Sequence, residues 1–324
     1  MSAPNPFRRL SQDSAVLAPS AAEYWTDRVF RRLALAATWS IVALVAWILL
    51  EIGGSALPAM RAYGLGFLGG QVWDANSGQF GILPQIWGTL YSSLLALVLG
   101  GFFGVTIALF LTQGFLPPRL GLVFRNIVEL LAAIPSVIYG LWGIFVVIPA
   151  IRPLADYLHQ QFDWIPFFST SLSGPGMLPA ALVLAIMILP TVAAISQDAL
   201  RAVPGKIIEA VYGMGTTRWE AIFKVILPTA GRSIFGALVL GLGRALGETM
   251  ALAMLVGNSN QLSISLFSPA NTLAALLALN FPEAGDLEVE ALMYGAVVLL
   301  LITLVVNLLG AAIVARASRH LENA

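Results

Sequence analysis

The chain has 324 residues, of which 58% are hydrophobic and only 10% are charged, whereas soluble domains are about 25% charged. A soluble globular protein is therefore excluded, and the balance of 17 basic and 17 acidic residues also excludes a basic surface for nucleic acid. Because there is no cysteine and the two histidines lie outside the apolar segments, neither disulfides nor a metal site are expected.

The N-terminal 32 residues precede the first apolar segment and are predicted to form a cytoplasmic tail. Residues 1–20 are rich in Ser, Pro and Ala and are expected to be disordered, whereas residues 21–32 suggest a short interfacial helix. The apolar segment that follows is as long as a true membrane span, which excludes a cleavable signal peptide.

Six apolar segments are long enough to cross a membrane, since a transmembrane helix needs about 20 mostly apolar residues. None alternates with a period of two, so we predict an all-α, polytopic membrane helix bundle. The six spans are expected at about 33–53, 86–111, 127–150, 177–198, 233–256 and 292–315. They belong to one membrane domain over residues 33–318, followed by a short tail at 319–324. A seventh apolar segment, 273–279, is too short to cross and is predicted to be re-entrant or interfacial.

The basic residues predict the orientation, because cytoplasmic loops are enriched in Lys and Arg. Fourteen of the 17 lie in the two tails and in the segments after the second and fourth spans. Both termini are therefore expected in the cytoplasm, and the loops near 54–85, 151–176 and 257–291 are expected on the outer side.

The third predicted span contains Pro135, which removes a backbone hydrogen bond inside the membrane. Free backbone groups at that depth are tolerated only against protein or a water-filled path. Ser136 and Tyr139 place hydroxyls beside the expected kink and could line such a path, although a simple helix bend explains the pattern equally well. Arg125 and Glu129, four residues apart, are expected to form a structural ion pair.

The segment 199–232, between the fourth and fifth spans, has a regular helical pattern that an irregular loop would not show. Apolar residues at helical spacing predict a helix over 207–212, a glycine-containing turn follows at 213–215, and a second helical stretch runs from Trp219 until Pro228 stops it. This pattern fits either a site that docks another protein or a helix that lies on the lipid surface.

Five residues of this segment carry a resemblance: Glu209, Ala210, Gly215, Leu227 and Pro228. Their spacing resembles the EAA loop of permease subunits in bacterial ABC importers, although Val211 and Val225 replace an alanine and an isoleucine of that motif. The resemblance implies a type I ABC importer permease fold, with a coupling helix seated in a groove of a separate ATPase. The resemblance implies that Glu209 and Gly215 are central to that contact, and glycine suits a turn with positive φ.

The chain has only two lysines, Lys206 and Lys224, and neither completes a phosphate-binding P-loop. No catalytic constellation is visible either. We therefore expect no catalytic site and no cofactor on this chain, with ATP and Mg bound by the partner ATPase.

Further stretches narrow the resemblance to the permeases of phosphate-specific ABC importers. They are the third span from Glu129 to Ala150, GLGRALGETMALAML at 241–255, LPTA at 227–230 and GNSN at 257–260. The N-terminal tail, GLWG at 140–143 and residues 266–281 are more similar to the PstC type than to the PstA type. The resemblance implies a bacterial inner-membrane location and three partners, namely a PstA-like second permease, a PstB-like ATPase dimer and a PstS-like phosphate-binding protein. The acidic outer stretch 283–290 is a candidate contact for the binding protein.

Arg244 and Glu248 lie near the middle of the fifth predicted span, where each ionisable group costs about 2.5–3.5 kcal/mol to insert. A spacing of four residues places them on one helix face, so they could be a structural ion pair. Alternatively, Arg244 meets the phosphate anion with its forked guanidinium, and Glu248 holds Arg244 between transport events. The family resemblance implies that both are needed for transport.

The expected mechanism is alternating access, in which closure of the ATPase dimer is transmitted through segment 206–222 to spans three to five. Two alternatives stay open. One is a permease for another oxyanion, such as sulfate or molybdate, and the other is an ATP-independent secondary transporter.

Overall fold

The computed structural model describes residues 21–322, so the predicted disordered segment 1–20 lies outside the described residues. The described chain divides into two compact units, the first ending at Glu51 and the second beginning at Ile52. The elements are α1 (Ala21–Tyr63), α2 (Gly66–Gly69), β1 (Trp73–Asp74), β2 (Gln79–Phe80), α3 (Leu83–Thr112), α4 (Pro118–Ala133), α5 (Ser136–Trp142), η2 (Gly143–Val147), α6 (Ile148–Phe162), η3 (Pro166–Phe168), α7 (Met177–Arg201), α8 (Gly205–Gly213), α9 (Arg218–Ala221), η4 (Ile222–Ile226), α10 (Leu227–Leu246), α11 (Met250–Leu255), α12 (Leu273–Asn280), η5 (Phe281–Glu283) and α13 (Asp286–Glu322).

Six helices of the described chain are long and apolar enough to cross a membrane, which confirms the predicted number of spans. They are Tyr24–Tyr63, Leu83–Thr112, Ser136–Phe162, Met177–Arg201, Arg218–Leu246 and Asp286–Arg316. The seventh apolar segment forms the short helix α12, as predicted. Within residues 21–322 the strands are limited to β1 and β2, an antiparallel pair that the sequence did not indicate.

The first span differs from its prediction in length. α1 is one continuous helix from Ala21 to Tyr63, so the helix predicted at 21–32 is present as the first part of a longer helix. The hydroxyls of Thr38 and Ser40 donate to the carbonyls four residues earlier, which satisfies these polar groups without interrupting the helix. No break is therefore needed where the polar residues give way to apolar ones.

The third span differs in position, and the predicted bounds 127–150 are wrong. α4 ends at Ala133, and Ile134 has an extended ψ of 126° because a residue that precedes proline is disfavoured in the helical region. The crossing helix instead runs from Ser136 to Phe162, and much of the predicted outer loop 151–176 is helical.

Two prolines follow π-helical turns and do not interrupt their helices, although Pro228 was predicted to do so. Pro149 follows the π-helical turn η2, and Pro228 follows the π-helical turn η4. The hydrogen bonds that close these turns, from Ile148 N–H to Gly143 O and from Leu227 N–H to Ile222 O, span five residues instead of four. The prediction that Pro228 stops the helix is therefore wrong, and helical structure continues from α9 through η4 into α10.

The centre of the second unit is the packing of α3 against α7. Gly100 and Gly104 allow this approach, since a Cβ on Gly100 would lie 2.6 Å from the carbonyl oxygen of Ala185. α10 packs on α7 and also on α13, which places its last turn beside α7.

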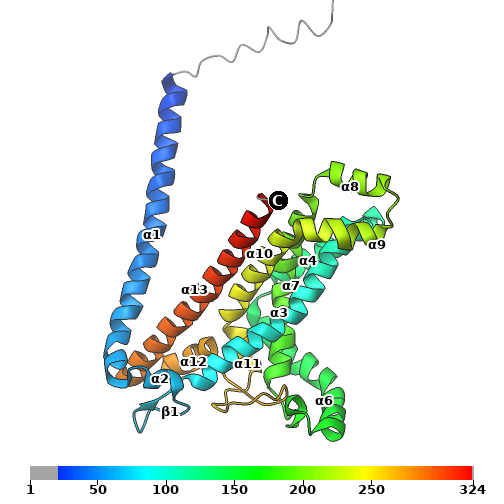
Figure 1. Cartoon of the computed structure of the whole chain (residues 1–324). Coiled ribbons are helices and arrows are strands. Elements are labelled where there is room, and N and C mark those ends of the chain that lie inside the picture. The colour runs from blue at the N-terminus through cyan, green and yellow to red at the C-terminus, as the bar shows by residue number, and fades with distance from the viewer. Residues whose placement is uncertain (1–20, 323–324) are drawn as a thin grey trace, which may run out of the picture. The chain divides into compact units, whose positions relative to one another are not determined.

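The two ends of the second unit carry different elements (Figure 1). α8 lies at the same end as the C-terminal end of α13, and α12 and β1 lie at the opposite end. At that opposite end, Trp73 Nε1 donates to Glu288 Oε1 at 2.9 Å, and the ring of Phe67 stacks on that of Tyr294. Asp286 and Glu288 lie in the first turn of α13, where the helix dipole favours carboxylates.

Candidate functional site

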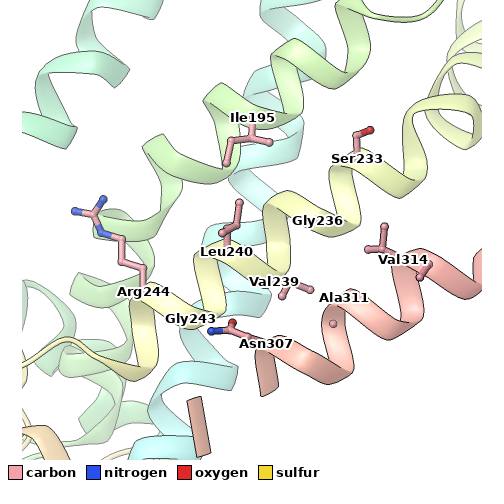
Figure 2. Close-up of a pocket in the computed structure, with 12 residues that line it drawn as sticks. Ile195, Ser233, Gly236, Val239, Leu240, Gly243, Arg244, Asn307, Ala311 and Val314 are labelled. Carbon is pink, nitrogen blue, oxygen red and sulfur yellow. The ribbon is translucent and has the colours of Figure 1, made fainter. Parts of the chain in front are cut away.

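Arg244 lies in the last turn of α10 and is exposed on the surface of the second unit. Its Nη1 donates to Thr191 Oγ1 of α7 at 3.2 Å, and its side chain points away from α13 (Figure 2). Within residues 21–322 the ion pairs join Arg125 to Glu129 and Lys224 to Glu220, so Arg244 has no carboxylate partner there. Most of the guanidinium N–H donors are therefore available to a ligand.

Glu248 does not pair with Arg244 here, which contradicts the structural ion pair, whereas a contact between transport events stays a prediction. α10 ends at Leu246, and the chain is not helical from Gly247 until α11 begins, so the two residues do not share one helix face. Glu248 Oε1 instead accepts a hydrogen bond from Ala251 N–H at 3.3 Å. A carboxylate is favoured at this helix N-terminus because the first amides of a helix have no backbone partner.

Ser136 and Tyr139 lie in the first turns of α5, directly after the break at Pro135. Ser136 is half-buried, whereas Tyr139 is only 5% exposed. The Tyr139 hydroxyl donates to the carbonyl of Leu131 in α4 at 2.8 Å and so bridges the break.

The expected ion pair between Arg125 and Glu129 is confirmed, with 3.0 Å from Nε to Oε1. Both side chains are well exposed, so the pair contributes little to stability.

The predicted coupling segment has the expected helix, turn and helix. Glu209 and Ala210 are exposed on α8, and Gly215 has a φ of +79°, which confirms the turn with positive φ. No atom lies within 4 Å of a Cβ built on Gly215, so backbone conformation and not packing is what requires glycine there.

Leu227 and Pro228 lie apart from that turn, at the junction of η4 and α10. Leu227 packs against a buried cluster that includes Ile222 and Ile226, and Pro228 is exposed. The structure therefore assigns these two residues to the start of α10.

Contacts from the end of α3 hold the coupling segment in place, and they were not predicted. The guanidinium of Arg218 lies 3.9 Å from the ring centroid of Phe115 and donates to the carbonyl of Gln113. Phe115 also contacts Trp219, with 5.1 Å between ring centroids. The aromatic residue directly after the second span was the available sequence signal.

An apolar groove of about 690 Å³ lies between α10 and α13, with Arg244 at its edge (Figure 2). Asn307 of α13 lies beside Gly243 of α10, and its Oδ1 would be 3.0 Å from a Cβ at that glycine. Asn307 was not singled out from the sequence, although it is an amide within a strongly apolar span. In the described part of the chain, no cluster of three or more His, Asp or Glu side chains is placed to bind a metal.

The comparisons with known proteins agree on the class of molecule. Residues 104–322 match the family described as binding-protein-dependent transport system inner membrane component. The phosphate transport system permease protein PstC of Mesorhizobium japonicum is 37% identical over 287 residues, covering 87% of this chain and 88% of the relative. The protein of the same name from Haemophilus influenzae is 39% identical over 290 residues, covering 88% and 92%.

Solved structures show the same fold. A chain of a bacterial alginate ABC transporter, solved with its pentasaccharide-bound periplasmic protein, superimposes with a TM-score of 0.62 at 16% identity. The match covers 90% of this chain and 97% of the other. At this identity the likeness concerns the fold alone.

Proposed function

This chain belongs to the binding-protein-dependent permease family, and within it to the PstC phosphate permeases, and we propose that Arg244 is the residue that phosphate meets inside the membrane. The chain is a multi-pass permease subunit of an ABC importer for phosphate. The names of its relatives favour phosphate over sulfate or molybdate, and membership of this family favours an ABC importer over an ATP-independent transporter.

The observation that carries the proposal is an arginine of a membrane protein that has no carboxylate partner among the described side chains. Arg244 lies at the end of an apolar helix, is exposed, and has its hydrogen bond to the neutral hydroxyl of Thr191. An arginine at this depth is costly against lipid, so its surface faces a water-filled path or another protein chain. A guanidinium there offers forked donors to a phosphate oxyanion.

Glu248, Ser136 and Tyr139 have supporting roles in this proposal. Tyr139 fixes the break between α4 and α5, and Glu248 fixes the start of α11. These contacts position the helix ends around Arg244, and Ser136 adds a hydroxyl to the wall of the path.

The energy for transport comes from a separate ATPase and not from this chain. ATP and Mg bind a PstB-like ATPase dimer, which contacts α8 through Glu209, Ala210 and the turn at Gly215. Helical structure is continuous from α9 to the last turn of α10, so motion at the ATPase reaches Arg244 through one helix. Leu227 and Pro228 lie in this connection.

A PstA-like permease forms the other half of the path, and a PstS-like protein delivers phosphate at the outer end. The acidic start of α13 is the proposed contact for that protein, although Glu288 is already bonded to Trp73. Both chain termini lie in the cytoplasm, as the distribution of basic residues indicates. α8 and the C-terminal part of α13 lie at the same end of the second unit, which supports this orientation (Figure 1).

Phosphate uptake by cells that carry the assembled importer tests the role of Arg244. We expect Arg244→Gln to lower uptake by about 10- to 100-fold, because a hydrogen bond to a charged group contributes about 1.5–3 kcal/mol. Arg61→Gln, a change at an exposed arginine near the end of α1, is the control and should retain uptake. Normal uptake by an assembled Arg244→Gln importer would refute the role.

Competition by other anions tests the substrate. Excess sulfate or molybdate should leave uptake of labelled phosphate unchanged, whereas arsenate, which shares the tetrahedral shape and charge of phosphate, should compete.

A further inference from the structure

A second groove lies between α4 and α7; unlike the first it is polar, and the function proposed above does not use it. Its volume is about 250 Å³. That space corresponds to roughly eight water molecules, at about 30 Å³ each in the liquid. Six of the residues that line it are polar or charged, namely Arg125, Glu129, Thr191, Gln197, Asp198 and Arg201. A lining with this share of polar side chains can hold water and a charged solute.

Thr191 connects this groove to Arg244. The Thr191 side chain lines the groove and also accepts the hydrogen bond from Arg244 Nη1 at 3.2 Å. Arg201, at the other end of the groove, follows Thr191 by ten residues in the same helix, which is about 15 Å at 1.5 Å per residue. The groove therefore extends from the proposed phosphate-binding arginine to the end of α7 that leads into α8.

The two arginines that line the groove differ in whether they have a carboxylate partner. Arg125 is neutralised by Glu129, whereas Arg201 contacts only the amide oxygen of Gln197, at 3.5 Å. Among the described residues, no carboxylate lies within 4.0 Å of the Arg201 guanidinium. Asp198 shares the groove and limits how tightly Arg201 can hold an anion, as a transport path requires for release.

We propose that the groove between α4 and α7 is the cytoplasmic exit of the phosphate path, and that Arg201 receives the anion after Arg244. The ligand class is a tetrahedral oxyanion, for which the forked donors of arginine are suited. Thr191 positions the Arg244 guanidinium at the inner end of the groove, and the pair Arg125–Glu129 forms the neutral wall opposite α7. This inference rests on the proposed phosphate transport and adds the exit route.

The first test separates an exit site from a structural role. We expect Arg201→Gln to lower the maximal rate of phosphate uptake by roughly tenfold with little change in KM, because a charge-assisted hydrogen bond in the exit step is lost. Arg201→Lys keeps the charge and should recover part of the rate. Arg119→Gln is the matched control, since Arg119 lies in the first turn of α4, is exposed and does not line the groove.

Unchanged kinetics in Arg201→Gln would overturn the proposal. It would also be overturned if the Gln and Lys variants lowered the amount of assembled importer equally, with no change in rate per importer.

The second test uses the absence of cysteine from the chain. Ala194→Cys places one thiol in the groove, and Val123→Cys places one on an exposed part of α4 outside it. In inverted membrane vesicles that contain the assembled importer, a negatively charged methanethiosulfonate reagent should modify Cys at position 194 at least tenfold faster than at 123. Inorganic phosphate should slow only the first reaction.

Equal rates at the two positions, in an importer whose parent still transports phosphate, would overturn the exit route alone. Loss of phosphate transport in the parent itself would refute the proposed function and this inference with it.

Discussion

Two helix breaks lie beside Arg244, and they are closed in different ways. Between α4 and α5 the chain turns at Pro135, and the Tyr139 hydroxyl donates to the carbonyl of Leu131 across the break. Between α10 and α11 there is no proline, and the Glu248 carboxylate accepts from Ala251 N–H. In both places a side chain replaces a backbone hydrogen bond that the break removes. Such a replacement is necessary in the membrane, because lipid chains offer no hydrogen-bond partner to a free backbone group.

The prolines elsewhere in these spans show that proline alone does not decide where a helix breaks. Pro149 and Pro228 follow π-helical turns and leave their helices continuous, whereas Pro135 follows an extended residue and begins a new helix. Pro190 also lies inside the continuous helix α7, so at Pro135 the extended residue before it, and not the proline by itself, marks the break. The fifth span combines an interruption after Leu246 with helical structure that is continuous back to α9.

The two breaks are held together by packing of α5 against α11, and disrupting that packing should have the largest effect. A Cβ on Gly140 would lie 2.6 Å from Met254 Sδ and 3.3 Å from its Cβ. We expect Gly140→Val to destabilise the permease by about 1–3 kcal/mol, measured as a lower thermal midpoint of the assembled importer in detergent. Gly121→Val is the control, because no atom lies within 4 Å of a Cβ there. Equal midpoints for the two variants would contradict close packing at the breaks.

The break at Pro135 should depend less strongly on its bridging hydroxyl. Tyr139→Phe keeps the buried ring and leaves the carbonyl of Leu131 without its partner. We expect a loss of about 0.5–1.5 kcal/mol, seen as a decrease of a few degrees in the thermal midpoint. Tyr157→Phe, at an exposed tyrosine of α6, should leave the midpoint unchanged. A similar decrease in both variants would show that the hydroxyl does not bridge the break.

Much of the fold could be predicted because hydrophobic length alone identifies a membrane span. All six spans and the short helix α12 were found in this way. The bounds of the third and fifth spans were wrong because hydropathy does not register a break such as the one at Pro135, nor the one after Leu246. Polar residues can also lie within a helix, which is why α1 begins well before its apolar part.

The candidate site was predicted less completely, and the reason is geometric. Arg244 and the turn at Gly215 could be identified because a mid-span charge and a positive-φ glycine have few alternative explanations. The pairing of Arg244 with Glu248 assumed one continuous helix, and its partner Thr191 lies 53 residues away in the chain. No spacing rule connects residues so distant, and for the same reason the groove that ends at Arg201 could not be predicted.

Removing the charge of Glu248 should have the smallest effect if this residue closes the second break and does not neutralise Arg244. Glu248→Gln keeps an oxygen that accepts from Ala251 N–H and removes only the interaction of the charge with the helix dipole, which contributes about 0.3–1 kcal/mol. Glu248→Ala also removes the acceptor, so thermal midpoint and phosphate uptake should both decrease in the order wild type, Gln, Ala. If Glu248 instead forms an ion pair with Arg244, Glu248→Gln and Glu248→Ala should both abolish uptake. That result would mean that the carboxylate reaches Arg244 in another state of the transport cycle.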